Sequence, residues 1–179
     1  MRLVPITAAD ALDIAGLATD TFTETFGHLY PPEDLDAFVA RFYDPAVLAA
    51  EIADPRQAWR LIRDDDGLAA YLQCGPVSLP HPEADPASHG EVKRLYVRAS
   101  RQGRGYGRRL LAEALDCLDT HYGDAPQWLG VWSENHKAQA LYAAHGFVRA
   151  GEYGFAVGRS LDHEFILRRD PAPATRPAP

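Results

Sequence analysis

Cysteine and methionine are scarce in this sequence. Its 179 residues include one methionine and two cysteines, Cys74 and Cys117. Both cysteines stand among apolar residues, and their spacing fits neither a disulfide framework nor a metal site. We therefore expect two reduced, buried thiols in a cytoplasmic protein that holds no metal.

Long hydrophobic runs are also absent. No apolar stretch approaches the roughly 20 residues that a membrane-spanning helix needs. The N-terminal residues, MRLVPITAADA, lack the apolar centre of a signal peptide. The sequence therefore predicts a protein with no membrane partner.

Basic residues are fewer than acidic ones. Lysine and arginine number 18 against 25 aspartates and glutamates, which gives a formal net charge of −7. An acidic protein is unsuited to general nucleic-acid binding, and its charge agrees with a cationic small substrate. Hydrophobic residues make up 46% of the chain, which suits one globular domain with a substantial core.

The periodicity of apolar residues divides the chain into strands and helices. Strands are expected at 2–6, 59–64, 68–74, 91–97, 128–132, 147–157 and 163–167. Helices are expected from Thr7, at 33–43, at 46–52, after Gly107 and after Asn135. The Asp65-Asp66-Gly67 turn predicts a hairpin, and hence a mixed sheet with helices on both faces. We expect one domain over residues 1–169 and a disordered, proline-rich tail at 170–179.

A glycine-rich turn separates the strand at 91–97 from the helix that follows. The turn reads Gln102-Gly103-Arg104-Gly105-Tyr106-Gly107. Alternating glycines let the backbone approach a ligand closely, and the first turn of a helix points unpaired N–H groups toward it. The helix dipole adds partial positive charge at the same place. This arrangement predicts a binding site for phosphate oxygens.

The spacing of the turn excludes two common phosphate-binding loops. A P-loop ends in Gly-Lys-Ser or Gly-Lys-Thr, which is absent here. A dinucleotide-binding fingerprint that begins at Gly103 requires glycine or alanine at the position of Arg108. The turn alone therefore does not identify the phosphate ligand, and the residues that follow it are needed.

A second stretch, residues 127–148, accompanies it. This stretch reads QWLGVWSENHKAQALYAAHGFV, a short apolar strand and then a helix that Ser133 or Asn135 caps. Tyr142 lies on the apolar face of that helix. The Gln-x-x-Gly-x-Gly turn after a strand that begins with Glu91, followed by this Asn, Tyr and Gly-Phe pattern, resembles the GNAT superfamily of acetyl-CoA-dependent N-acetyltransferases. The resemblance covers nearly the whole chain except the tail.

The resemblance implies an α/β (α+β) fold with a mixed, mostly antiparallel sheet of about six to seven strands. It also implies acetyl-CoA as cosubstrate. Backbone N–H groups would hold the pyrophosphate at Gln102, Gly103, Arg104, Gly105, Tyr106 and Gly107. Backbone groups of Leu95, Tyr96 and Val97 would bind the pantetheine arm and the thioester carbonyl, and the side-chain amide of Asn135 would hold the same arm. Strand pairing and helix capping are the alternative roles of these last four residues.

Acetyl transfer requires a neutral amine. An alkyl amine has a pKa near 10.4, so removing its proton at neutral pH costs about 4.6 kcal/mol, which a positioned base has to offset. Glu91 is the candidate base, acting through water, and on an ideal strand it shares a face with Leu95 and Val97. Its alternative role is an ion pair with Lys93 or Arg94 on a solvated edge.

The leaving thiolate also requires a proton, and Tyr142 is the candidate acid. A phenol can hydrogen-bond the sulfur and return a proton to it. In the family that the chain resembles, a tyrosine on this helix does so. Because Tyr142 lies on the apolar face, packing in the core is its alternative role.

The acceptor amine is less well defined. The segments TFTETFGHLY, WLGVWSEN and GEYGFAVG resemble the bacterial spermidine/spermine acetyltransferase branch, in which the first two helices and the late strands wall the acceptor cleft. A polyamine favours carboxylates and aromatic faces. The candidate substrate-binding residues are Glu24, Phe26 and Tyr30. Further candidates are Asp34, Asp36, Glu152, Tyr153 and Glu164.

Three functions fit these observations. The first is acetylation of a primary amine on a small cationic molecule, such as a polyamine. The second is acetylation of a protein N-terminus or lysine; a narrow pocket favours the first and an open groove the second. The third is a non-catalytic, regulatory acetyl-CoA-binding protein, against which the presence of both Glu91 and Tyr142 argues. The resemblance also implies that the protein could form a homodimer, because family members are often dimers.

Overall fold

The computed structural model describes residues 2–170, so the tail predicted at 170–179 lies outside the described residues apart from Asp170. The helices are α1 (Ala11–Phe26), α2 (Pro32–Phe42), α3 (Pro45–Ala53), α4 (Tyr106–Tyr122) and α5 (His136–Ala143). The strands are β1 (Arg2–Pro5), β2 (Ala58–Asp64), β3 (Gly67–Pro76), β4 (Gly90–Val97), β5 (Gln127–Trp132), β6 (Val148–Val157) and β7 (Ser160–Arg169). Each element that the sequence predicts is present, with ends that differ by a few residues. In the described part of the chain, no helix combines the length and apolarity needed to cross a membrane.

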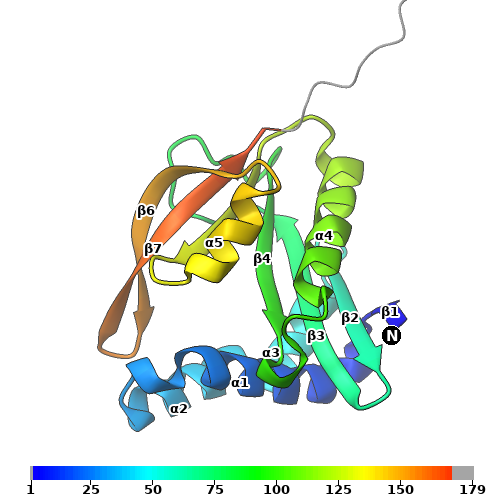
Figure 1. Cartoon of the computed structure of the whole chain (residues 1–179), viewed down its shortest axis with the longest axis vertical. Coiled ribbons are helices and arrows are strands. Elements are labelled where there is room, and N and C mark those ends of the chain that lie inside the picture. The colour runs from blue at the N-terminus through cyan, green and yellow to red at the C-terminus, as the bar shows by residue number, and fades with distance from the viewer. Residues whose placement is uncertain (1, 171–179) are drawn as a thin grey trace, which may run out of the picture.

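The strands form one seven-stranded sheet in the order β1-β2-β3-β4-β5-β7-β6. Neighbouring strands run antiparallel except β4 and β5, which are parallel. β1–β3 lie on one side of β4, and β6 and β7 lie on the other (Figure 1). The mixed, mostly antiparallel sheet that the resemblance implies is therefore confirmed.

Each face of the sheet carries its own hydrophobic core, because successive side chains of a strand point to opposite faces. On one face, Leu110 of α4 packs in a cluster with Leu72 of β3. On the other, Phe22 of α1 and Phe38 of α2 cluster with Tyr71 of β3, and the two phenyl rings stack 4.7 Å apart. Helices therefore cover both faces, as the sequence predicts.

The two parallel strands pair over a short length only. Gly90 pairs with Gln127 and Glu91 with Trp128, and no further pair follows along these fully described strands. On its other edge, β4 pairs with β3 from Gly90 to Val97. Beyond Glu91, the edge of β4 that faces β5 therefore has main-chain N–H and C=O groups without a strand partner.

A bulge interrupts β4 at Lys93. Arg94 pairs with Gln73 of β3, and the next pair joins Val92 to Cys74, so Lys93 has no opposite residue. An extra residue in one strand shifts the alternation of side chains on either side of it. Residues before and after Lys93 therefore do not follow the face assignment of an ideal strand.

This bulge overturns the predicted orientation of Glu91. Val92 packs in the same core as Leu95 and Val97, on the face covered by α4. Glu91 instead borders a cavity on the opposite face together with Tyr96. The expectation that Glu91 shares a face with Leu95 and Val97 is wrong, because it assumed an unbroken strand.

Candidate active site

The glycine-rich turn leads from β4 into α4 through a short 3-10 helix at Ala99–Arg101. Gly103 and Gly105 have φ angles of 80° and 82°, in the left-handed region that favours glycine. A Cβ atom added at either position would meet nothing within 4 Å. Glycine is therefore required here for the backbone angle, and the space in front of the turn stays open to a ligand.

The backbone N–H groups of this turn are available to a ligand. Within the described residues, no acceptor takes a hydrogen bond from the backbone N–H groups of residues 103–108. Gln102 differs, because its N–H donates to the carbonyl of Ala99 at 3.2 Å. Its side chain donates to the carbonyl of Val97 and accepts from Lys137. The predicted anion site therefore fits from Gly103 onward, and Gln102 shapes the turn.

A cavity of about 610 Å³ opens where β4 and β5 diverge. It is bordered by the glycine-rich turn, by residues 92–97 of β4, by residues 130–132 of β5 and by α5. The expected contacts Leu95, Tyr96 and Val97 all lie on it. The free N–H groups of the turn and the unpaired edge of β4 therefore face one space, which suits an extended ligand with phosphates at one end.

Two side chains of the α5 segment border the same cavity. Asn135 caps α5, because its Oδ1 accepts from the backbone N–H of Ala138 at 3.1 Å, and its amide nitrogen donates to no described residue. Tyr142 is 8% exposed, and its hydroxyl forms no hydrogen bond with the described residues. Burial, together with the nearby carboxylate of Glu164, raises the pKa of Tyr142 to about 12. Its phenol is therefore protonated at neutral pH.

A second cavity, of about 430 Å³, lies on the face covered by α1 and α2. Its aromatic lining consists of Phe22, Phe26, Tyr30, Phe38, Phe42, Tyr43, Tyr96, Tyr153 and Phe155. Its carboxylates are Glu51, Glu91, Asp162 and Glu164, and its basic residues are Lys93 and Arg94. The residues that border both cavities are Phe26, Lys93, Arg94, Tyr96, Gly130 and Glu164. The two cavities therefore meet beside β4 and β5.

Glu91 lies on the second cavity and is only 6% exposed. Its Oε2 accepts from the backbone N–H of Ser78 at 2.6 Å, from the Ser78 hydroxyl at 2.9 Å and from the Nζ of Lys93 at 3.1 Å. The ion pair with Lys93 that the sequence offered as an alternative is present, but it is buried and not on a solvated edge. Glu91 therefore borders the cavity, and one of its two carboxylate oxygens already accepts three hydrogen bonds.

Asp162 and Glu164 form a second acidic group on this cavity. They are two residues apart in β7, so both side chains project from the same face of the strand. The hydroxyl of Tyr153 donates to Glu164 at 2.5 Å, and the hydroxyl of Tyr30 donates to Asp162. Burial raises the pKa of Glu164, and the nearby carboxylates of Asp162 and Glu91 raise it further, against the hydrogen bond from Tyr153.

The basic residues of the second cavity are paired. Arg94 forms an ion pair with Glu51, and its guanidinium lies 5.6 Å from the ring centroids of both Tyr43 and Trp59. Lys93 is paired with Glu91. Asp162 and Glu164 have no such cationic partner within residues 2–170, so the cavity carries an excess of negative charge.

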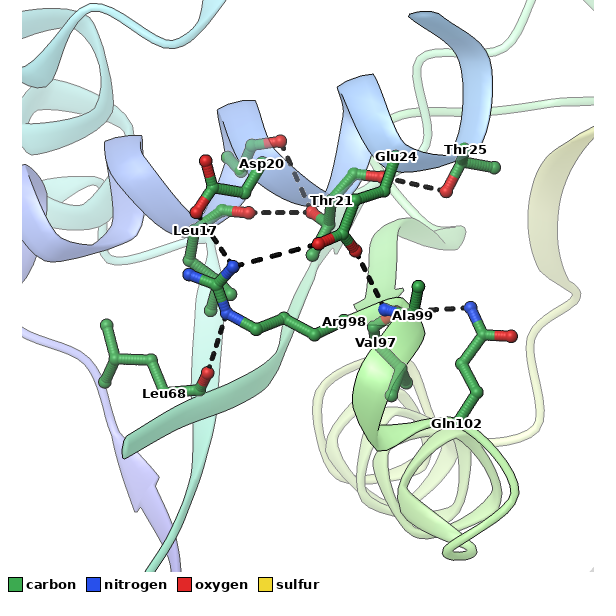
Figure 2. A network of polar contacts seen from close by, with 11 residues as sticks. Leu17, Asp20, Thr21, Glu24, Thr25, Leu68, Val97, Arg98, Ala99 and Gln102 are labelled. Carbon is green, nitrogen blue, oxygen red and sulfur yellow. Dashed lines mark hydrogen bonds and ion pairs between the residues drawn. The ribbon is translucent and has the colours of Figure 1, made fainter. Parts of the chain in front are cut away.

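One predicted substrate-binding residue, Glu24, lies elsewhere. It borders neither cavity, and its carboxylate accepts from the backbone N–H of Ala99 at 2.8 Å. Figure 2 shows that Arg98 extends this network to Asp20, at 2.8 Å, and to the carbonyl of Leu68, at 3.0 Å. Glu24 therefore connects the turn after β4 to α1, away from both cavities, and its predicted role in substrate binding stays a prediction.

The remaining substrate candidates divide into two groups. Phe26, Tyr30, Tyr153 and Glu164 lie on the second cavity. Asp34, Asp36 and Glu152 border neither cavity. Asp34 accepts from Arg159, and Glu152 pairs with Arg149 and His163, so these carboxylates serve contacts within the fold.

The sequence does not single out Asp162 and Ser78, which are two of several further polar residues on the second cavity. Asp162 lies one residue before the strand predicted at 163–167, whereas β7 begins at Ser160. A predicted strand that began earlier would have placed Asp162 and Glu164 on one face, because they are two residues apart. Ser78 carried no such signal, since its contact with Glu91 depends on the path of the loop between β3 and β4.

Both cysteines are free thiols, with Cys74 buried and Cys117 half-buried. Across residues 2–170, no group of three or more His, Cys, Asp or Glu side chains is arranged to hold a metal ion.

Comparison with known proteins identifies the family. The model of the acetyltransferase (GNAT) family matches residues 14–147. An uncharacterized N-acetyltransferase of Lactobacillus delbrueckii subsp. lactis is 30% identical over 169 residues, which cover 94% of this chain and 96% of that protein. The N-alpha-acetyltransferase RimI of Mycobacterium tuberculosis is 32% identical over 128 residues, covering 72% and 75% of the two chains.

The solved structures include the PaiA N-acetyltransferase from Thermoplasma acidophilum in complex with coenzyme A. It matches with a TM-score of 0.74 at 17% identity and covers 95% of this chain and 99% of that one. At this identity the likeness concerns the fold. The chain belongs to the acetyltransferase (GNAT) family: it is an N-acetyltransferase, and acetyl-CoA is its cosubstrate.

Proposed function

We propose that the protein acetylates the primary amine of a small cationic acceptor, with polyamines as the favoured class. The observation that carries this proposal is the acidic, aromatic second cavity, in which Asp162 and Glu164 lack a cationic partner among the described residues. Carboxylates and aromatic rings both attract alkylammonium groups. A volume of about 430 Å³ is in the range of small-molecule sites.

The first cavity holds acetyl-CoA in this proposal. The N–H groups of residues 103–108 bind the pyrophosphate, and the unpaired edge of β4 at Leu95, Tyr96 and Val97 binds the pantetheine amides. Asn135 offers its amide nitrogen to the same arm. The thioester then lies where the two cavities meet, between the cosubstrate side and the acceptor side.

Tyr142 serves as the acid in this proposal. It borders the cosubstrate cavity, and its hydroxyl has no partner within the described residues to compete for its proton. With a pKa of about 12, the phenol keeps its proton at neutral pH and can give it to a thiolate as that leaves. Glu91, the base that the sequence predicts, borders the acceptor cavity and not the cosubstrate cavity.

A second candidate function is acetylation of the α-amine of a peptide. The relative RimI is an N-alpha-acetyltransferase by name, and the α-amine of a peptide also suits an acidic cavity. The volume and enclosure by aromatic side chains favour a small acceptor over an extended peptide. A purely regulatory protein is disfavoured, since both Tyr142 and Glu91 line the cavities.

A thiol-release assay tests the proposal. Acetyl-CoA is incubated with spermidine, spermine, putrescine, an aminoglycoside, free amino acids and a peptide with an N-terminal alanine. We expect the polyamines to give the highest kcat/KM. Higher kcat/KM with the peptide would establish the second function instead, and acetyl-CoA binding without release of thiol by any amine would overturn both.

A further inference from the structure

We propose that Glu164, on β7, is the residue that takes the proton from the acceptor ammonium group. This inference rests on the proposed function and names the base of that same site. Glu164 is the carboxylate that borders both the cosubstrate cavity and the acceptor cavity. A base has to lie within hydrogen-bond reach of an amine that also reaches the thioester, so a position at the junction is the geometric requirement.

The absence of a side chain at Gly130 brings Glu164 to this junction. Gly130 lies in β5, which pairs with β7, and Glu164 is opposite Trp132. A Cβ atom added at Gly130 would lie 2.8 Å from the Tyr153 hydroxyl and 3.1 Å from Oε2 of Glu164. Contacts this short force atoms to move. Glycine at this position therefore leaves the space that the Glu164 carboxylate and the Tyr153 hydroxyl occupy.

The surroundings leave Glu164 more able than Glu91 to accept a proton. Oε2 of Glu91 accepts three hydrogen bonds, one of them from Lys93. Glu164 accepts one, from Tyr153, and no lysine or arginine in the described range forms an ion pair with it. An unpaired carboxylate at the mouth of the acceptor cavity also attracts the ammonium group that it then deprotonates.

Titratable groups from every neighbouring element act on Glu164. On β7 and β4 these are the carboxylates of Asp162 and Glu91. Four phenols also lie close enough to interact with Glu164. They belong to Tyr30 in the segment after α1, Tyr96 in β4, Tyr142 in α5 and Tyr153 in β6. Lys93 and Arg94 also border both cavities, and each is paired with another carboxylate. Burial and the two carboxylates raise the pKa of Glu164, which makes it a stronger base than an exposed glutamate.

The Glu164 carboxylate takes one proton from the R–NH₃⁺ acceptor, and the resulting amine nitrogen forms a bond to the thioester carbonyl carbon. The carbon–sulfur bond breaks, and the sulfur receives its proton from Tyr142. The nitrogen loses its second proton, through water, to the Tyr142 phenolate. Glu164 then releases its proton to solvent, so the products are the amide, coenzyme A and one proton.

The pH dependence of Glu164→Gln tests this assignment. With its base in place, the wild-type protein uses the ammonium form, so kcat/KM is flat from about pH 7 to pH 9. Glu164→Gln has to bind the scarce neutral amine, so its kcat/KM falls about 100-fold or more at pH 7 and rises about tenfold per pH unit. A merely structural loss would lower the whole profile without changing its shape.

The probe is acetyl-CoA with the amine from the panel that the wild-type protein acetylates fastest. Glu83→Gln is the matched control, because Glu83 is exposed, pairs with Arg168 and borders neither cavity; we expect a wild-type profile. A Glu164→Gln profile parallel to the wild type overturns the inference, and a rising profile in Glu91→Gln alone assigns the base to Glu91. If no amine is acetylated by the wild-type protein, the proposed function itself fails.

Discussion

At the scale of single residues, three polar groups border the two cavities, and Glu164 is the one of the three that borders both. Tyr142 keeps a proton that it can give, and Glu164 offers a carboxylate that no described cation pairs with. Glu91 is buried in an ion pair with Lys93. We propose that the environment of each side chain, more than its type, decides which of these groups gives a proton and which takes one.

Replacing Tyr142 with phenylalanine removes the proposed acid and keeps the ring. We expect kcat to fall by about 10- to 1000-fold, because the thiolate then leaves without a positioned proton donor. The Kd for acetyl-CoA, measured by calorimetry, should stay close to that of the wild type, because the variant keeps the ring on the cavity and leaves the backbone groups proposed to bind the pyrophosphate unchanged. Tyr122→Phe is the control, because Tyr122 lies at the end of α4 and borders neither cavity. Unchanged turnover of Tyr142→Phe would remove this residue from the mechanism.

At the scale of elements, the proposed cosubstrate site depends on how β4 passes into α4. The turn after β4 is held to α1 by Glu24, which accepts from the backbone N–H of Ala99. Gly103 and Gly105 then carry the chain through left-handed angles into the first turn of α4. The turn thus presents free N–H groups from a fixed position, as an anion site requires.

Replacing Gly105 with valine tests this turn. A β-branched residue is strained at a φ of 82° and places methyl groups in the open space before the helix. We expect the Kd for acetyl-CoA to rise by about tenfold or more. The control is Gly123→Val, which introduces valine at a φ of 60° at the opposite end of α4, also with no atom within 4 Å. Both variants should have a lower Tm, but only Gly105→Val should bind acetyl-CoA more weakly. If calorimetry gives Gly105→Val the same Kd for acetyl-CoA as the wild-type protein, the turn does not hold the pyrophosphate.

At the scale of the whole molecule, the sequence predicted what is local and missed what depends on the order of the strands. The glycine-rich turn, the Asn135 cap and Tyr142 each belong to one short stretch, so their pattern was readable. The sequence predicts Glu164 as a substrate-binding carboxylate but not its place where the two cavities meet, which depends on β7 lying beside β5 and on the space that Gly130 leaves. The bulge at Lys93 likewise arises from pairing with β3, and the alternation of residues 91–97 alone could not reveal it.

The division of the sheet into β1–β4 and β5–β7 leads to a prediction for the whole domain. The two parts are joined at β4 and β5 by two residue pairs, Gly90 with Gln127 and Glu91 with Trp128. An acetyl-CoA arm bound to the free edge of β4 would add contacts along the gap between them. At a concentration 100 times its Kd, a ligand that binds only the folded state stabilises it by about 2.7 kcal/mol. For a domain of this size, we expect Tm to rise by about 5–10 °C.

Hydrogen exchange shows where that stabilisation arises. We expect acetyl-CoA to slow exchange at residues 95–97 and at residues 103–108, since both segments have N–H groups without a backbone acceptor on the side of the cavity. ADP is the matched control: it carries the diphosphate and lacks the arm, so it should protect residues 103–108 and leave residues 95–97 unchanged. In this proposal, residues 103–108 bind the diphosphate and residues 95–97 bind the arm. Protection of residues 95–97 by ADP, or a failure of acetyl-CoA to protect either segment, would therefore mean that the cosubstrate binds in another place.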